Sequence, residues 1–411
     1  FAVNGVTCSG TPISFDYIIE PTPIMNNVAD QTLCAGENTV QVDFSGVAGG
    51  NYNWINDNPQ TGLPVSGTES ILPFSTSNSG QQAISSLVTV TPILNGCVGL
   101  SENFSITVNP IPVLNPISSI DTCSDLLVNI PFSGSGTAYN WTNDNSSTGL
   151  TSSGSGDILF TTSNSGVQSL SSTISVEPVF TSNSVSCAGN IETFTISVQP
   201  IPYVNSIVDQ ELCNNEQTQL VLFSSAVSGT SFTWSNSNTQ IGLSSNGTIE
   251  IPSFTAINTS NSVLSSIVTV SPTANGCVGP DSSFQFIVNP TPTISNNLLS
   301  DTLCSGDLSN EVIWSSNVVG TTYSWTAAVT SGSLVNPVLS GTGNLLSTAY
   351  TNSGSTAAVL LFTVVPEFNG CIGQAITYER VVNPVPVLSP ITAQDICGGI
   401  AFTTPAFLST V

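Results

Sequence analysis

Cysteine is the residue type whose number and spacing in this sequence could do chemistry, namely the formation of disulfide bonds. The gaps between successive cysteines alternate between about 26 and about 64 residues, which sets a period near 90. Such regular spacing favours structural disulfides in an oxidising compartment over buried free thiols. The ten cysteines are Cys8, Cys34, Cys97, Cys123, Cys187, Cys213, Cys277, Cys304, Cys371 and Cys397.

The charged residues exclude most catalytic and nucleic-acid functions. The chain has 25 Asp and Glu, one basic side chain, Arg380, and neither Lys nor His, so its net charge is −24. Nucleophile systems and zinc sites that use His, and phosphate loops that use Lys, therefore cannot be built. Nucleic acid and anionic membranes are excluded as partners because no cations neutralise their phosphates. We expect that the chain is not an enzyme.

Carboxylates are the remaining catalytic option, because glycosidases use a pair of them about 5–10 Å apart. The acidic residues here are scattered, and no pair recurs from one repeat to the next. We interpret them as solvated surface charge, so no catalytic residue is predicted. Examples are Asp43, Glu69, Glu102, Asp157 and Glu250.

Three polar turns resemble calcium loops, since Ca²⁺ takes hard oxygen ligands. Two of them read Asn-Asp-Asn, at 56–58 and 143–145, but the third, at 236–238, has Ser in place of Asp. Asn and Asp also suit turns because their side chains hydrogen-bond to the nearby backbone. We therefore predict turns and no metal or cofactor, with calcium as the minor alternative.

Short alternating strands are the elements that must position these residues. Segment 104–108, Phe-Ser-Ile-Thr-Val, alternates apolar and polar side chains, and Asn-Gly or Ser-Gly turns recur along the chain. No window shows the period of an amphipathic helix. Alternation of this kind, rich in Val, Ile and Thr, is typical of half-buried antiparallel sheets. The sequence predicts an all-β fold of tandem β-sandwich repeats, each of about 90 residues.

Each repeat has the same order of motifs. A Pro-x-Pro joint is followed by a cysteine, an aromatic-x-Trp pair, a polar turn and a turn that ends in the second cysteine. Because each proline fixes φ and removes an N–H, the joint stops one sheet from running into the next and is semi-rigid. The expected object is an elongated rod, on the order of 150 Å for four repeats. The joints are at 21–23, 110–112, 200–202, 290–292 and 384–386.

The period divides the chain into four whole repeats and two partial ones. We expect the chain to be a fragment of a longer protein, because both ends fall inside a repeat. The apolar run 357–365 is too short to cross a bilayer and suits a buried strand. The predicted ranges are 1–24 (the end of a preceding repeat), 25–113, 114–204, 205–294, 295–387 and 388–411 (the start of a fifth repeat).

The tryptophans of the aromatic-x-Trp pairs are predicted to be core residues rather than a sugar-stacking platform. Residues at i and i+2 lie on one face of a strand, and in a sandwich that face is usually the core. Trp314 breaks this register, so it is the aromatic residue to test for surface exposure. The predicted core tryptophans are Trp54, Trp141, Trp234 and Trp325.

Two disulfide connectivities remain open. The preferred pairing lies within each repeat, since each unit could then fold alone. Against it, the two cysteines fall in loops that normally lie at opposite ends of an immunoglobulin-like domain, whereas bridged Cα atoms lie within about 7 Å of each other. The alternative, with Cys34–Cys187 or Cys123–Cys277 as examples, joins neighbouring repeats and would stiffen the rod. The pairs within repeats are Cys34–Cys97, Cys123–Cys187, Cys213–Cys277 and Cys304–Cys371.

The Cys-x-Gly turn, the Tyr-x-Trp pair, the Asn-Gly-Cys-x-Gly turn and the Asn-Pro-x-Pro joint resemble the PKD-like, immunoglobulin-like repeats of very large surface adhesins from gliding Gram-negative bacteria. The resemblance implies export by type IX secretion, attachment at the outer membrane and a part in gliding motility. Its implied partners are neighbouring repeats, the outer-membrane secretion and motility machinery, and an extracellular surface or polysaccharide bound by other domains. The second repeat departs from the pattern at 185–187, Val-Ser-Cys, and the fourth has a longer middle.

These features predict a structural stalk or filament segment of a secreted cell-surface adhesin. One alternative is that the repeats themselves bind polysaccharide or another surface, which an exposed aromatic patch would favour. Another is an accessory region of a secreted hydrolase. Arg380 as the only tryptic site predicts resistance to trypsin.

Overall fold

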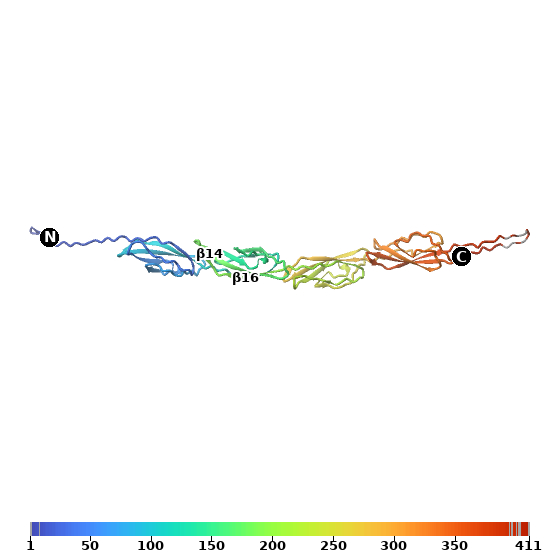
Figure 1. Cartoon of the computed structure of the whole chain (residues 1–411), viewed down its shortest axis with the longest axis horizontal. Helices are drawn as coiled ribbons and strands as arrows, with labels where there is room; N and C mark the ends of the chain where they lie inside the picture. The colour runs from blue at the N-terminus through green and yellow to red at the C-terminus, as the bar shows by residue number, and fades with distance from the viewer. Residues whose placement is uncertain are drawn as a thin grey trace. The chain divides into compact units, whose positions relative to one another are not determined.

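The structure is a computed structural model that describes residues 2–7, 9–393, 395, 398–399, 401 and 404–409. The described residues form strands and loops with only three short 3-10 helices, which confirms the predicted all-β class (Figure 1). Contacts divide the chain into two compact units, residues 1–200 and 201–411. Each unit contains two six-stranded sheets, so the predicted tandem β-sandwiches are present. No described helix has the length and apolar character needed to cross a membrane.

The first sheet shows the topology that all four share. Its strands lie in the order β3-β8-β6-β4-β5, with β7 paired to β6. All its pairs are antiparallel except β3, which runs parallel to β8 along the sheet edge. The strands are β3 (Gln31–Cys34), β4 (Asn51–Asn56), β5 (Ser66–Thr68), β6 (Ile84–Leu94), β7 (Cys97–Val98) and β8 (Glu102–Asn109).

The other three sheets repeat this order with their own strands. The second is β12-β11-β14-β16-β9 with β15 beside β14, the third β17-β24-β22-β19-β20 with β23, and the fourth β25-β30-β28-β26-β27 with β29. Figure 1 labels β14 and β16, neighbours in the second sheet. Their bounds are β9 (Ile120–Cys123), β11 (Ala138–Asn143), β12 (Ser153–Ser155), β14 (Leu170–Ser182), β15 (Val185–Ala188), β16 (Glu192–Gln199), β17 (Gln210–Cys213), β19 (Ser231–Asn236), β20 (Asn246–Thr248), β22 (Leu264–Ala274), β23 (Cys277–Val278), β24 (Ser282–Asn289), β25 (Ser300–Cys304), β26 (Thr322–Ser331), β27 (Ser340–Thr342), β28 (Ala358–Phe368), β29 (Cys371–Ile372) and β30 (Ile376–Asn383).

A second, smaller layer covers one face of each sheet. It is the pair β10 (Leu127–Ile130) and β13 (Ile158–Thr161) in the second repeat, and β18 (Val221–Leu222) and β21 (Glu250–Ile251) in the third. In the first repeat it is reduced to isolated bridges such as Val42↔Ile71, and in the fourth to bridges such as Val312↔Leu345. The remaining strands are β1 (Ala2–Val3) and β2 (Val6–Thr7).

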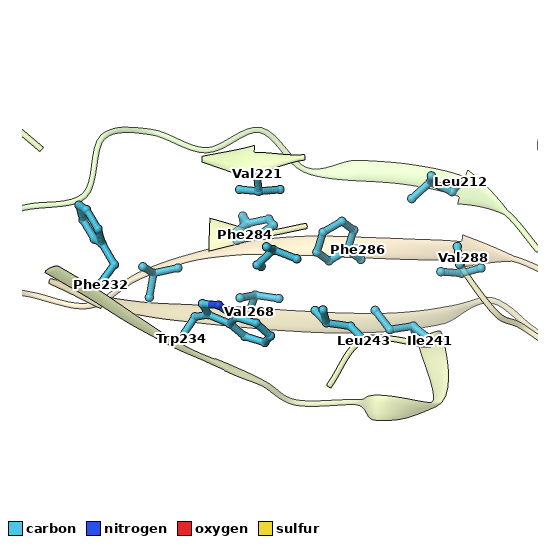
Figure 2. Close-up of a cluster of buried hydrophobic side chains, with 13 residues drawn as sticks. Leu212, Val221, Phe232, Trp234, Ile241, Leu243, Val268, Phe284, Phe286 and Val288 are labelled. Atoms are coloured by element: carbon cyan, nitrogen blue, oxygen red, sulfur yellow. The ribbon is translucent and has the colours of Figure 1, made fainter. Parts of the chain in front are cut away.

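Each repeat has a separate hydrophobic core between its two layers. Figure 2 shows the third, in which Phe284 of β24 lies beneath Val221 of the second layer and Val288 lies nearer to Leu212. Alternate residues of these strands are fully buried because side chains point to opposite faces of a strand. The apolar run expected to form a buried strand is β28, whose Leu360 is fully buried. Separate cores fit the prediction of tandem repeats, while the boundaries between the predicted repeats stay a prediction.

The strand with the aromatic-x-Trp pair packs its tryptophan over a glycine on the neighbouring strand. Trp141 is paired with Gly154, and a Cβ added to Gly154 would lie 2.1 Å from the indole ring. Trp54 and Gly67 have the same relation in the first repeat. A side chain at these glycines would displace the ring, so the Ser-Gly or Asn-Gly dipeptide of this short strand is a packing requirement.

Candidate functional site: disulfide-linked junctions between repeats

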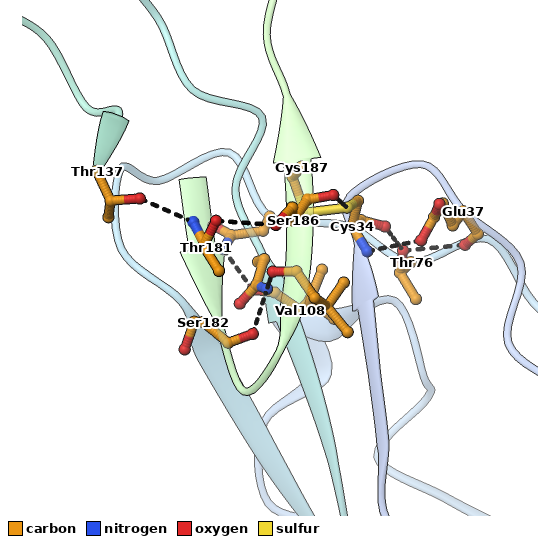
Figure 3. The surroundings of a disulfide bond; sticks show 12 residues. Cys34, Glu37, Thr76, Val108, Thr137, Thr181, Ser182, Ser186 and Cys187 are labelled. Carbon is orange, nitrogen blue, oxygen red and sulfur yellow. Dashed lines mark hydrogen bonds between the residues drawn. A yellow bond between two sulfur atoms is a disulfide. The ribbon is translucent and has the colours of Figure 1, made fainter. Parts of the chain in front are cut away.

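A disulfide bond joins the first repeat to the second (Figure 3). Cys34 is the last residue of β3, and Cys187 lies on β15, which forms a hairpin with β14. The two sulfur atoms are 2.00 Å apart and the two Cα atoms 5.6 Å apart. The linked residues are 153 positions apart in the sequence, so the bond closes a loop that spans two repeats. Closing a loop of this length stabilises a fold by about 5 kcal/mol in the chain-entropy model.

Side chains of the first repeat hold Cys34 in place. The Cys34 N–H donates to the Glu37 carboxylate (2.8 Å), and the Thr76 hydroxyl donates to the Cys34 carbonyl (2.7 Å). The Ala35 N–H donates to the Asn109 carbonyl (2.9 Å) and extends the parallel pairing of β3 and β8. The cysteine is therefore fixed by its own repeat before it meets its partner.

Asn109 makes a second contact across the same junction. Its side chain is fully buried, and its Nδ2 donates to the carbonyls of Ser182 and Val185, each at 3.2 Å. These two carbonyls flank the turn at Asn183 and Ser184, both of which have positive φ. A buried amide needs such partners because an unpaired one costs free energy. The amide thus recognises the backbone of the cysteine turn independently of the disulfide.

The junction between the third and fourth repeats is built in the same way. Cys213, at the end of β17, is bonded to Cys371 of β29, with Cα atoms 5.5 Å apart and 158 positions between them in the sequence. Asn289, the counterpart of Asn109, accepts a hydrogen bond from Asn369 Nδ2 at 3.2 Å. Asn369 opens the Asn-Gly-Cys turn and has a positive φ of 46°. Two junctions therefore share the covalent bond and a contact of the same asparagine position. The asparagine donates to backbone carbonyls at the first junction and accepts from a side-chain amide at the second.

The predicted pairing of cysteines within each repeat is wrong. In the first repeat, Cys34 pairs with Asn109 at the end of β8, whereas Cys97 lies beside Leu94, near the start of β8. An eight-residue strand separates the two cysteines, so they lie about 25 Å apart. That distance is far beyond disulfide reach. The alternative left open by the sequence, a bond between neighbouring repeats, is confirmed for Cys34–Cys187.

The other cysteines fall into three groups. Cys123 and Cys277 also take part in disulfide bonds, and their link to each other stays a prediction. Among the described cysteines, Cys97 and Cys304 are free, so their assignment as disulfide candidates is not met within this chain. Cys97 is partly exposed and Cys304 exposed. Cys8 and Cys397 lie outside the described residues.

The Pro-x-Pro joint packs against the next repeat at a glycine. A Cβ added to Gly189, two residues after Cys187, would lie 2.0 Å from the Pro112 carbonyl oxygen. Gly373 has the same relation to Pro292. The Cys-x-Gly part of the Asn-Gly-Cys-x-Gly turn is therefore required by close approach of the joint. The joint is held at this point as well as at the disulfide.

The asparagine turns, for which calcium binding is the minor alternative, use their side chains as turn and cap groups. Asn58 is the N-cap of η1 (Pro59–Thr61), with its Oδ1 accepting from the Gln60 N–H at 3.2 Å. Asp57 accepts from the Leu87 N–H at 2.7 Å, and Asn56 donates to the Leu63 carbonyl. Asn145 and Asn238 cap η2 (Ser146–Thr148) and η3 (Thr239–Ile241) in the same manner. Among the described residues, no group of three or more acidic, His or Cys side chains could hold a metal ion.

The predicted core tryptophans lie in the cores. Trp54, Trp141 and Trp234 are buried, and Trp325 is partly buried against the fourth core. Trp314, the aromatic residue singled out for a test of surface exposure, is buried, with only 5% of it exposed. Its ring packs edge-on against Tyr378, with centroids 5.8 Å apart. The additional tryptophan is therefore part of the core of the fourth repeat.

Arg380 is fully buried in the same core, which the sequence analysis did not anticipate. Its Nε donates to both carboxylate oxygens of Asp301, at 2.9 and 3.1 Å, and its Nη2 donates to the Asn310 carbonyl at 3.0 Å. Burial lowers the pKa of the Arg380 guanidinium, but the hydrogen bond and charge of Asp301 outweigh it, so the pKa lies above its ordinary value. Burial raises the pKa of Tyr378 to about 12. The ion pair is a local feature of one repeat, because the same strand position is Ile106, Ile196 or Phe286 in the others.

The asparagine that precedes each Pro-x-Pro joint is the functional residue that the sequence analysis missed. Asn109, Asn289 and Asn383 occupy this position, and the second repeat has Gln199 there. A signal was present, since a polar residue ends an otherwise apolar-alternating strand. Its role depends on contacts between repeats, which the pattern of one repeat does not show.

Comparisons with known proteins support this architecture over part of the chain. Residues 301–386 match the family model described as a PKD-like domain. A search of curated proteins finds no match. Solved structures with detectable similarity include the I-band fragment I67–I69 of titin, with TM-score 0.35 and 10% identity, covering 67% of this chain and 98% of that one. The protocadherin gamma B2 cadherin domains 3–6 have TM-score 0.30 and 11% identity, covering 88% and 99%. Over the fourth repeat, the chain is therefore similar to PKD-like domains.

Proposed function

We propose that this chain is a load-bearing spacer segment of an extracellular surface protein. The observation that supports it is the linkage of successive repeats by Cys34–Cys187 and Cys213–Cys371. A bond within a repeat would stabilise that repeat alone, whereas a bond between repeats restrains how one repeat moves against the next. Such restraint keeps the two ends of the segment apart and lets the segment carry mechanical load.

The geometry of each junction gives this restraint a physical basis. At the first junction, the peptide joint at Pro112, the Asn109 amide and the Cys34–Cys187 bond are three separate points of attachment. One flexible joint allows rotation about itself, but three attachments at different places remove most rotations. The proline joints add stiffness because their φ angles are fixed. A rod of this kind holds a distal binding domain away from its anchor.

The compartment follows from the cysteines. Disulfides persist in oxidising environments and are rare in the cytosol. The described cysteines include six that are disulfide-bonded. An extracellular location is therefore supported by chemistry that is independent of the family match at residues 301–386.

More specifically, we propose that the spacer is a stalk of a bacterial surface adhesin with a part in attachment and gliding. It is supported by the resemblance of the turn and joint motifs to PKD-like repeats of giant adhesins, and it includes attachment at the outer membrane after type IX secretion. Direct sugar binding by the repeats has less support, since Trp314 is buried. Antibodies raised against this chain should label intact cells that produce it. Labelling seen only after permeabilisation would overturn the surface assignment.

Small-angle X-ray scattering of the oxidised and reduced chain tests the spacer proposal. We expect the oxidised chain to give one elongated, narrowly distributed shape, and reduction to broaden the distance distribution because the junctions become hinges. The double variant Cys34→Ser/Cys187→Ser should show part of this broadening without reductant. Cys97→Ser is the matched control, since it removes a free thiol and leaves both bonds intact. Identical profiles before and after reduction would refute the proposal that disulfides stiffen the chain.

A further inference from the structure

The buried asparagine amide has opposite orientations at the two bonded junctions. At the first junction, Asn109 Nδ2 donates to the carbonyls of Ser182 and Val185 in the turn of the next repeat. At the junction between the third and fourth repeats, Asn289 Oδ1 accepts from the Asn369 side chain, so the amide oxygen faces the next repeat. Both asparagines are almost fully buried, and a group of the wrong polarity opposite either amide would leave buried polar groups unpaired.

The residue two positions before the junction cysteine sets this orientation. Glu211 precedes Cys213 by two residues, and its carboxylate accepts from Asn289 Nδ2 at 2.8 Å. An ionised carboxylate can only accept, so the NH2 group of Asn289 faces Glu211 and the amide oxygen faces the neighbouring repeat. Residues at i and i+2 share one face of a strand, which places this position on the same side of the strand as the cysteine.

Thr32 occupies the same position before Cys34, and the amide of Asn109 is turned the other way. Asn109 Oδ1 is buried and has no hydrogen-bond partner among the described residues. Without a carboxylate to hold its NH2 group, Asn109 donates to the neighbouring repeat instead. A glutamate in place of Thr32 would bring a second acceptor to the unpaired oxygen.

The cysteine turns of the following repeats differ in the same sense. Gln199 Nε2 donates to Asp121 at 2.9 Å, which repeats in the second repeat the contact made by Glu211 in the third. The repeats after Asp121 and Glu211 have Asn-Gly-Cys turns, whereas the repeat after Thr32 has Val-Ser-Cys; these turns are at 275–277, 369–371 and 185–187. An acidic residue therefore accompanies an Asn-Gly-Cys turn, and threonine accompanies the turn that presents backbone carbonyls.

We propose that the residue at positions 32 and 211 is a specificity determinant, which selects the type of cysteine turn that a repeat accepts from its neighbour. Threonine lets the junction asparagine donate to a turn that presents carbonyls, and glutamate makes it accept from a turn that presents an NH2 group. The ten cysteines recur in similar motifs, so this selection favours Cys34–Cys187 and Cys213–Cys371 over mixed pairs. The inference rests on the spacer function, because it concerns how the same junctions are matched in the correct order.

Substitutions at position 32 test the rule at the first junction. Thr32→Glu and Thr32→Gln introduce side chains of nearly the same size, but only Gln can donate to the unpaired oxygen of Asn109. Each variant of the full chain is equilibrated with reduced and oxidised glutathione at about 1 M salt, where the screening length is about 3 Å. After quenching and digestion with a protease that needs neither Lys nor Arg, mass spectrometry gives the fraction of Cys34–Cys187, with Cys213–Cys371 in the same molecule as the reference.

We expect Thr32→Glu to lower the equilibrium constant for formation of Cys34–Cys187 about tenfold, because the Asn109 amide then turns its oxygen toward two backbone carbonyls. Thr32→Gln should retain at least the original constant, since it pairs the oxygen and leaves the NH2 group in place. Equal constants for the two variants would overturn the proposal.

A compensating pair at the other junction separates selection from simple damage. Asn369→Asp should weaken Cys213–Cys371 about tenfold, because an acceptor then faces the Asn289 oxygen. Adding Glu211→Thr should recover at least about threefold of this loss, because the released amide can turn and donate to the new carboxylate. A double variant no stronger than Asn369→Asp alone would also overturn the proposal.

The unmodified chain distinguishes failure of this inference from failure of the spacer function. If Cys34–Cys187 and Cys213–Cys371 do not form in it, the spacer function fails and the selection rule fails with it. If both bonds form but the substitutions at 32, 211 and 369 do not have these effects, the spacer function holds and the selection rule alone is refuted.

Discussion

Mechanical extension of a single molecule should show how much of the chain each inter-repeat disulfide shields from force. The chain is held at its two ends and pulled until all repeats unfold, with Cys123 and Cys277 replaced by Ser so that the two remaining bonds can be counted separately. Residues between two bonded cysteines cannot extend, because force passes directly through the sulfur atoms. The 153 positions between Cys34 and Cys187 correspond to about 500–550 Å of hidden contour length.

The oxidised chain should therefore be shorter at full extension than the reduced chain by about 500–570 Å for each of the two bonds, since Cys213 and Cys371 are 158 positions apart. Cys34→Ser/Cys187→Ser should recover one such length without reductant. The comparison does not require that the variant repeats refold, because only the final contour length is measured. Cys97→Ser is the control and should leave the length unchanged.

The result that would refute this reasoning is a hidden length of about 200 Å per bond. That length corresponds to a loop within one repeat, as for Cys34–Cys97. No difference between oxidised and reduced chains would refute the presence of the bonds altogether.

Three further predictions concern single repeats. Arg380→Ile should destabilise the fourth repeat by about 3–5 kcal/mol, because it leaves the partly buried Asp301 without its partner. Adding Asp301→Gln, which copies Gln31 and Ile106 of the first repeat, should restore most of the loss in urea unfolding. Equal stability of the single and double variants would contradict the role of the ion pair. Folding raises the pKa of Tyr378 from 10.0 to about 12. The contribution of the neutral Tyr378 side chain to stability is therefore complete below pH 10 and is lost as the pH rises to about 12. Tyr378→Phe should flatten the fall in thermal midpoint over this pH range, and an unchanged slope would contradict this prediction. Gly154→Ala should lower the free energy of unfolding by about 1–3 kcal/mol, because the added Cβ displaces the Trp141 ring. The measurement is urea unfolding, and the control is Gly10→Ala, where an added Cβ meets no atom within 4 Å. Equal midpoints for the two variants would argue against the close packing.

The sequence predicted the features that repeat within each unit and depend on local pattern. Alternation along 104–108 predicts a strand with one buried face, and Phe104, Ile106 and Val108 are buried in β8. The aromatic-x-Trp spacing predicts that Trp54 faces the core, because i and i+2 share a face. Such features need only strand geometry and the hydrophobic effect, and both act over a few residues.

The features that escaped prediction depend on which residues meet across space. The pairing of Cys34 was left open because the sequence does not show that β3 runs parallel to β8, which places this cysteine at the far end from Cys97. The periodic pattern does not place Trp314, because its position has no counterpart in that pattern. The burial of Arg380 is not predicted because Arg is rarely buried without a partner, and that partner, Asp301, lies 79 positions away in the sequence.

The span of the Cys34–Cys187 bond also bears on what a broken backbone would do to this protein. The bond joins points 153 positions apart and encloses the joint between two repeats. If one peptide bond within that span is cut, by a protease or by chemical damage, the two fragments stay attached through the sulfur bridge. Tension still passes through the sulfur bridge around the damaged point, and separation requires a second break. Residues 34–187 and 213–371 therefore tolerate an isolated cut without loss of either fragment, which suits a protein that is exposed to damage outside the cell and cannot be repaired there.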